Sequence, residues 1–178
     1  MPHLDAAYNL ARWLTRNEHD AQDVVQDAFL RAFRFFDGFR GSEGRAWLLT
    51  IVRHTCYSWL EKNRPAEVRA GFDEESAAAD AAGFDPDMMA AEGGNPEAIA
   101  LQNAHKRILN QAIALLPLGF REVLILRELE EMSYKEIARV VDVPVGTVMS
   151  RLARARQLLR QSAPLRAMGG FAVTEVKR

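Results

Sequence analysis

Four arginines without an acidic neighbour make residues 144–160 the segment of this chain best suited to binding an anion. They are Arg151, Arg154, Arg156 and Arg160. A basic stripe along one helix is the electrostatic footprint of a surface that binds nucleic-acid phosphates. The alternative is a solvated helix face, which is the more frequent meaning of a run of charge. The stripe alone leaves both interpretations open.

The local sequence around this stripe favours DNA. Residues 133–156 read SYKEIARVVDVPVGTVMSRLARAR, and Ser133 followed three positions later by Glu136 has the form of a capping box. A turn of three to four residues is expected at 142–144, and Ala138 is small where a second helix must cross closely. These features together predict a helix-turn-helix.

The second helix of this motif is expected over residues 145–162. It buries Val148 and Leu152, which are one turn apart, and its N-terminal residues would enter the major groove of duplex DNA. Arginine can bind guanine through two hydrogen bonds, and serine or threonine can bond a base edge or a phosphate. The residues expected to face DNA are Lys135, Thr147, Ser150, Arg151, Arg154 and Arg156.

A second candidate site lies in residues 45–64, which interleave aromatic and basic side chains. Stacking rings combined with positive charge suit unpaired bases and their backbone. The rings are Trp47, Tyr57 and Trp59, and the charges are Arg45, Arg53, Lys62 and Arg64. Aromatic residues at helical spacing are more often core, so we expect Trp47 in the core and leave Trp59 open.

Other chemistry has little support. The single cysteine, Cys56, excludes an intramolecular disulfide, and none of the four dispersed histidines has metal-ligand spacing with it. The chain has neither a glycine-rich phosphate loop nor a Ser-His-Asp signature. We therefore expect no enzyme activity, no metal and no cofactor.

The elements that position these sites are predicted to be helices throughout. Apolar residues recur at helical spacing in both halves of the chain. In the N-terminal half these are Leu10, Trp13 and Leu14, then Val25, Ala28, Phe29, Ala32, Phe33 and Phe36 in a helix capped at Asp20. In the C-terminal half, helices are expected over 99–116, 120–131, 134–141 and 145–162.

Charge divides the chain into segments, although its formal net charge is only −1. Residues 65–104 hold nine acidic and one basic side chains, and few large apolar residues lie between 65 and 96. Such a stretch cannot bury enough surface to offset its ordering entropy. We predict domains over 1–64 and 98–163, a flexible acidic linker over 65–97 and a tail over 164–178. In the free protein, the linker could fold back on the basic recognition helix.

Two motif blocks resemble a known family when taken together. The segments DAQDVVQDAFLRAFRFF and RAWLLTIVRHTCYSWLEKNR, then an acidic linker, then REVLILRELEEMSYKEIARVVDVPVGTVMSRLARARQLL, are similar to extracytoplasmic-function sigma factors. These are small bacterial sigma factors that keep only regions 2 and 4. The resemblance implies an all-α protein that binds core RNA polymerase and directs promoter-specific transcription initiation.

The resemblance also assigns roles to residues. The helix over 23–36 is similar to the segment that grips the clamp coiled coil of the polymerase β′ subunit. The matching positions are Asp23, Gln26, Asp27, Leu30, Arg31 and Phe33. The −10 reader would comprise Arg45, Arg53, His54, Tyr57, Trp59, Lys62 and Arg64, and the helix-turn-helix would read the −35 element.

The expected partners are therefore core polymerase, promoter DNA and an anti-sigma factor. No apolar run is long enough for membrane insertion, and we expect a cytoplasmic protein. One alternative is a free-standing helix-turn-helix regulator that binds duplex DNA without polymerase. Another is an interaction protein with no DNA role.

Overall fold

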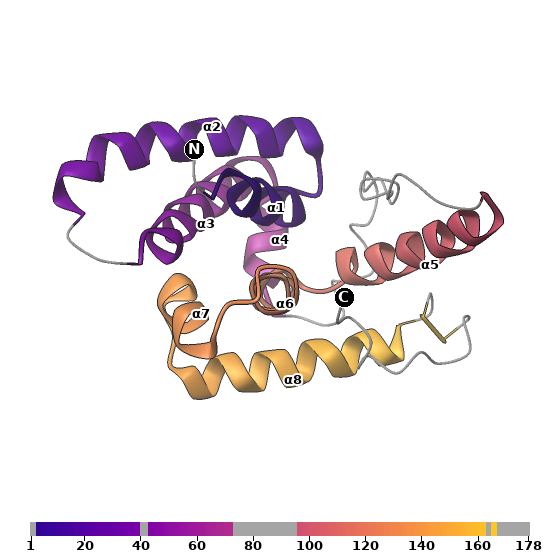
Figure 1. Ribbon diagram of the computed structural model, residues 1–178. Coiled ribbons are helices and arrows are strands. Elements are labelled where there is room, and N and C mark those ends of the chain that lie inside the picture. The colour runs from indigo at the N-terminus through magenta and orange to yellow at the C-terminus, as the bar shows by residue number, and fades with distance from the viewer. Residues whose placement is uncertain (1–2, 40–42, 73–95, 163–164, 167–178) are drawn as a thin grey trace.

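The computed structural model describes residues 3–39, 43–72, 96–162 and 165–166, and within these ranges every regular element is a helix (Figure 1). The all-α prediction is confirmed. The N-terminal half contains α1 (Leu4–Thr15), α2 (Glu18–Phe35), the 3-10 helix η1 (Phe36–Gly38), α3 (Gly44–Asn63) and α4 (Pro65–Ala70). The C-terminal half contains α5 (Pro96–Ala114), α6 (Leu118–Glu128), α7 (Tyr134–Val141) and α8 (Val145–Gln161).

The N-terminal half is a three-helix core in which α1, α2 and α3 pack on one another. Leu10 and Leu14 of α1 share one buried cluster with Leu49, Val52 and Leu60 of α3, and all five are fully buried. Burying a leucine or valine side chain contributes about 1.5–3 kcal/mol. This core fixes α2 and α3 as the surfaces on which the predicted sites lie.

The start of α2 differs from the sequence prediction. The helix is capped by Asn17, whose side chain accepts a hydrogen bond from the Asp20 amide at 3.1 Å. Asp20 therefore lies within the first turn and was wrongly predicted as the cap. Its carboxylate still sits at the positive end of the helix dipole, where negative charge is stabilising.

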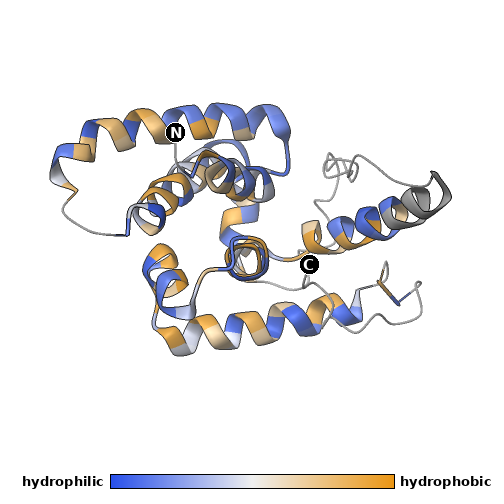
Figure 2. Cartoon of the chain, viewed as in Figure 1, coloured by the Kyte–Doolittle hydropathy of each residue, from blue (hydrophilic) through white to orange (hydrophobic). Residues whose placement is uncertain are grey.

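The apolar face of α2 is also narrower than predicted. The buried residues of the helix are Ala21, Val24, Val25, Ala28 and Ala32. Phe33 and Phe36, predicted to be core, are 84% and 62% exposed. Phe33 lies about 100° around the helix from Ala32, which takes it off the buried stripe. Apolar colour gathers toward the η1 end of α2, whereas its start is mostly hydrophilic (Figure 2).

The chain stays with the N-terminal half beyond Pro65, where the linker was predicted to begin. Pro65 opens α4 at a position where its missing N–H would have no partner in the helix anyway. Glu67, in the same short helix, is buried. Residues 73–95 of the predicted linker lie outside the described residues.

The helix-turn-helix is formed by α7 and α8 as predicted. Ser133 accepts from the Glu136 amide at 3.3 Å, and the Glu136 carboxylate accepts from the Ser133 amide at 2.7 Å. The capping box is thus confirmed. Asp142 adopts a left-handed conformation that ends α7, and Val148 and Leu152 of α8 are buried in the core.

The two halves contact each other directly. α6 packs on α1 and α4, while α7 packs on α3. In Figure 1, α6 is seen end-on between the N-terminal helices and α8. The amide of Gly119 in α6 donates to the carbonyl of Gly71 at 2.7 Å. Buried apolar residues of both halves belong to one cluster, so the predicted DNA readers lie beside an interface between the halves.

Candidate nucleic-acid interface

The outer face of the helix-turn-helix carries part of the predicted −35 set. Lys135 and Ser150 are exposed, and Thr147 is half-buried in the first turn of α8. Thr147, Ser150 and Arg154 follow a spacing of three and four residues, which places them on one face of α8. The guanidinium of Arg154 donates to the side-chain oxygen of Gln157 at 2.8 Å.

Arg156 and Arg151 are held by acidic residues of α6 instead of pointing away from the protein. The guanidinium of Arg156 donates to Glu128 at 2.7 Å, and this hydrogen bond raises the pKa of Arg156. The Arg151 guanidinium lies 3.9 Å from Glu122 and 4.2 Å from the centre of the Phe72 ring. The prediction that Arg151 faces outward is therefore wrong.

The middle of α3 is engaged by the same Glu122. Arg53 donates to its two carboxylate oxygens at 2.8 and 3.3 Å, and the Tyr57 hydroxyl donates at 3.0 Å. Burial opposes the charged form of Arg53, but the hydrogen bond and charge of Glu122 outweigh burial and raise the pKa of Arg53. Burial, with Glu122, raises the pKa of Tyr57, so the phenol stays protonated and donates.

The remaining predicted −10 residues are spread along α3 and its C-cap. His54 and Lys62 are exposed. Arg45 is paired with the buried Glu130 at 2.5 Å. The Arg64 guanidinium lies 5.4 Å from the centre of the half-buried Trp59 ring, within cation–π range.

Trp47 lies at the edge of the core. It is half-buried, and its ring lies 4.8 Å from that of Phe39 and 6.5 Å from that of Phe36. The prediction that Trp47 lies in the core is confirmed only in part, because the ring packs against the core but stays half-buried. The three rings help to line an open apolar groove of about 590 Å³ beside α2.

The predicted polymerase-binding residues all face solvent. Asp23, Gln26, Asp27, Leu30, Arg31 and Phe33 are exposed along α2. Leu30 is 56% exposed and Phe33 is 84% exposed. The acidic and amide groups therefore share a surface with apolar side chains, an arrangement typical of a protein docking site.

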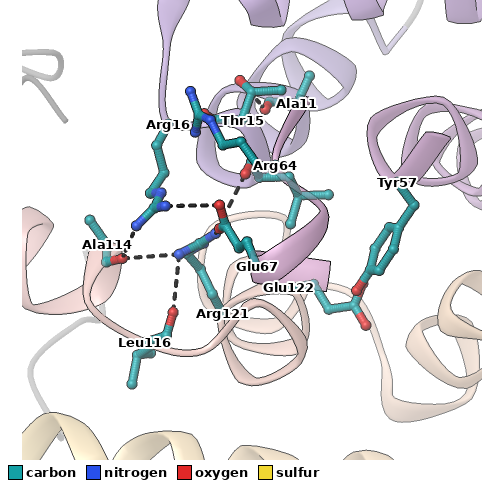
Figure 3. A network of polar contacts seen from close by, with 11 residues as sticks. Ala11, Thr15, Arg16, Tyr57, Arg64, Glu67, Ala114, Leu116, Arg121 and Glu122 are labelled. Carbon is teal, nitrogen blue, oxygen red and sulfur yellow. Dashed lines mark hydrogen bonds and ion pairs between the residues drawn. The ribbon is translucent and has the colours of Figure 1, made fainter. Parts of the chain in front are cut away.

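Sequence reasoning missed the charged residues that hold the halves together. Glu67 accepts from Arg121 at 2.6 Å and from Arg16 at 2.8 Å (Figure 3). Burial and the nearby Arg16 lower the pKa of Arg121 to about 10. The sequence does contain one indication of this cluster, because Arg121 and Glu122 are charged residues inside an otherwise apolar stretch of α6. Both side chains are only 1% exposed.

No alternative chemistry emerges from the described residues. Cys56 is fully buried, and burial raises the pKa of its thiol. In the part of the chain that the structure describes, no group of three His, Cys, Asp or Glu side chains could hold a metal ion. Nor does any helix among those residues have the length and apolar character needed to cross a membrane.

Comparison with known proteins decides the family. The Sigma-70 region 2 model matches residues 1–65, and the Sigma-70 region 4 model matches residues 106–159. The ECF RNA polymerase sigma-E factor of Haemophilus influenzae is 36% identical over 151 residues, covering 84% of this chain and 77% of that protein. The chain belongs to the ECF RNA polymerase sigma factors. The sigma-E factor of Escherichia coli K12 is 38% identical over 141 residues, covering 79% of this chain and 72% of its own length.

Two solved structures match most of the length of this ECF sigma factor. RpoE of Bartonella quintana, in complex with the anti-sigma factor NepR, covers 92% of this chain with 91% of its own (TM-score 0.68, 27% identity). CnrH, in complex with the cytosolic domain of CnrY, covers 93% of this chain with 83% of its own (TM-score 0.59, 28% identity). This protein is thus a promoter-specific sigma factor that acts with RNA polymerase, and the free-standing regulator is set aside.

Proposed function

We propose that the exposed face of α2 is the surface with which this sigma factor binds the clamp coiled coil of the polymerase β′ subunit. The observation that carries this proposal is the exposure of Leu30 and Phe33 beside Asp23, Gln26 and Asp27. A contiguous exposed patch of large apolar side chains, rimmed by polar residues, marks a protein interaction site. The carboxylates make the surface electrostatically complementary to a basic coiled coil. Such complementarity raises the association rate and orients the partner.

The DNA-binding roles are divided between the halves. α3, with Arg45, Arg53, His54, Tyr57, Trp59, Lys62 and Arg64, reads the −10 element as a single strand. α7 and α8 read the −35 duplex, with Lys135 on the backbone and Thr147, Ser150 and Arg154 at the groove. Arg151 and Arg156 join them once they leave their carboxylate partners on α6. The polymerase carries out the chemistry, and this chain supplies promoter selection and strand opening without a cofactor.

An anti-sigma factor is the expected regulatory partner. The matched RpoE structure is a complex with the anti-sigma factor NepR, and the matched CnrH structure is a complex with the cytosolic domain of CnrY. The likeness to those chains covers 92% and 93% of this chain and so includes regions 2 and 4, which supports a partner that contacts both.

Binding to purified core polymerase tests the α2 surface. A Phe33→Ala variant should lose about tenfold or more in affinity, because a buried aromatic hot spot contributes about 2 kcal/mol or more to an interface. Phe35→Ala is the matched control: Phe35 is 65% exposed on the same helix but lies outside the predicted set. Equal affinity for wild type and Phe33→Ala, or an equal loss for Phe35→Ala, would refute this placement.

A further inference from the structure

The outer face of α8, the helix proposed to read the −35 duplex, is short-chained and largely uncharged over its first turns. Val148 and Leu152 mark the opposite, buried face, which packs toward α6 and α7 (Figure 1). The exposed positions that follow a helical spacing of three and four residues are Gly146, Met149, Ser150 and Ala153. These are the turns of a recognition helix that contact base edges.

Met149 is the one large side chain of this face. It is 52% exposed, and Val145, one turn earlier, is 36% exposed. Gly146 and Ala153 lie on either side of Met149 along the helix, and both are exposed. Because these neighbours are so short, the backbone of α8 can lie deep in a major groove while the methionine reaches a base edge.

The chemistry of a methionine limits what Met149 can recognise. A thioether has no hydrogen-bond donor and is only a weak acceptor, so it cannot distinguish bases by hydrogen bonding. Its chain is unbranched and its sulfur polarizable, which lets it pack closely on an apolar group. The apolar group that bases present in the major groove is the C5-methyl of thymine.

The neighbouring Ser150 fits the same base pair. Its hydroxyl donates to the carbonyl of Thr147 at 3.0 Å, so its oxygen is left to accept. The base donors in the major groove are the amino groups of adenine and cytosine. A T·A pair presents a methyl group and an adenine amino group on one edge, and so offers a partner to each of these two side chains.

The charges around Met149 suit DNA better than a protein partner. The sequence of α8 contains no acidic residue. Lys135 at the start of α7 and Arg160 near the end of α8 are exposed, and Arg154 is half-buried one turn beyond Ser150. Interfaces with duplex DNA are much more positively charged than interfaces between proteins. The surrounding cations can therefore bind phosphates while Met149 meets a base.

We propose that Met149 is a specificity-determining residue of this sigma factor, which contacts the C5-methyl group of a thymine in the −35 element. This inference rests on the proposed role of α7 and α8 in reading that duplex. Uracil differs from thymine only by the methyl group, so uracil at the contacted position should not replace thymine. Burial of one methyl group is worth about fourfold in affinity.

Removal of single methyl groups from the DNA tests this contact. Holoenzyme made from core polymerase and the full chain first selects its sites from a random-sequence duplex library long enough to hold both elements. The selected duplex is then remade with each thymine of the −35 element, on either strand, replaced singly by deoxyuridine. One replacement should weaken binding of wild-type holoenzyme about fourfold. Holoenzyme carrying Met149→Ala should bind the thymine and uracil forms of that duplex equally.

Two further variants separate a base contact from a general loss of affinity. Met149→Leu keeps an apolar tip and should retain the dependence on the methyl group. Arg154→Ala should bind both forms less tightly but keep the ratio of about fourfold between them, because a phosphate contact does not sense the base. Since Met149 is half exposed, its replacement should leave the fold intact.

The thymine contact is overturned if wild-type holoenzyme tolerates uracil at every −35 position, or if Met149→Ala keeps the full dependence on the methyl group. A selected −35 element without thymine on either strand would overturn it as well. These results leave the proposed function standing, because a −35 sequence has still been selected. A holoenzyme that enriches no −35 sequence from the library would refute the proposed role of α7 and α8, and the thymine contact with it.

Discussion

Replacing Glu67 with glutamine should destabilise this protein more than removing the buried arginine that it binds. Glu67 accepts from Arg121 at 2.6 Å through one oxygen and from Arg16 at 2.8 Å through the other. All three side chains are buried. Arg121 also donates to the carbonyls of Ala114 and Leu116 at 2.9 and 3.0 Å. One carboxylate thus balances two guanidinium groups (Figure 3).

The magnitudes follow from this imbalance. Burial, and then the charge of Arg16, lower the pKa of Arg121 from 12.5 to about 10, which corresponds to roughly 3 kcal/mol against its charged form. Glu67→Gln leaves both guanidiniums without a carboxylate in the cluster and should cost about 3–5 kcal/mol. Arg121→Met leaves Arg16 paired with Glu67 and loses the carbonyl hydrogen bonds, so about 1–2 kcal/mol is expected.

Urea denaturation followed by far-ultraviolet circular dichroism measures both changes. With a slope of about 2 kcal/mol per molar urea, the midpoint should fall by about 1.5–2.5 M for Glu67→Gln and about 0.5–1 M for Arg121→Met. Glu61→Gln, at an exposed position in α3, is the control and should stay within about 0.5 kcal/mol of wild type. A loss for Arg121→Met equal to or larger than that for Glu67→Gln would refute the charge-balance argument.

Three further predictions concern separate features. The side-chain and backbone hydrogen bonds with Ser133 lower the pKa of Glu136 below 4.5, so its stabilisation is present above that value and is lost as pH falls through the lowered pKa. Glu136→Gln should therefore be about 1 kcal/mol less stable than wild type at neutral pH, and the two urea midpoints should converge once the pH falls below the lowered pKa of Glu136. A difference in midpoint that persists under those acidic conditions would contradict the carboxylate as the source of the stabilisation. Cys56 should react with a thiol reagent at least about a hundredfold more slowly in the native protein than in denaturant, and rapid native labelling would contradict its burial. Arg154→Ala should weaken binding of the holoenzyme to −35 duplex and lower the salt slope by about 0.9 if it contacts a phosphate, with Arg160→Ala as the control; unchanged affinity at every salt concentration would remove Arg154 from the site.

The features that sequence predicted well depend on residues close together in the chain. The capping box of Ser133 and Glu136 and the burial of Val148 and Leu152 follow from spacings of three and four residues. The helix-turn-helix could therefore be located without any structure.

The face of α2 was less predictable because an aromatic residue at helical spacing fits both a core and a docking surface. Phe33 follows Phe29 by four residues, yet Phe29 packs against the core and Phe33 is exposed. What distinguishes them is the width of the surface that α1 and α3 offer to α2, a tertiary property.

The interface between the halves could not be predicted from local patterns. Arg53 and Glu122 are 69 residues apart, and Arg45 and Glu130 are 85 apart. From the sequence alone, the basic residues of α3 are predicted to be unpaired and able to bind DNA, because their acidic partners are distant in the chain. A charge inside an apolar helix, as at Glu122, is the one local sign that such a partner exists.

Run-off transcription with purified core polymerase tests the central claim most directly. Templates carrying several candidate promoters are transcribed with core alone, with core and this chain, and with core and Phe33→Ala. The account predicts a promoter-dependent product only when the wild-type chain is present, and less product with the variant at limiting concentration. The absence of any chain-dependent product across those promoters would contradict it.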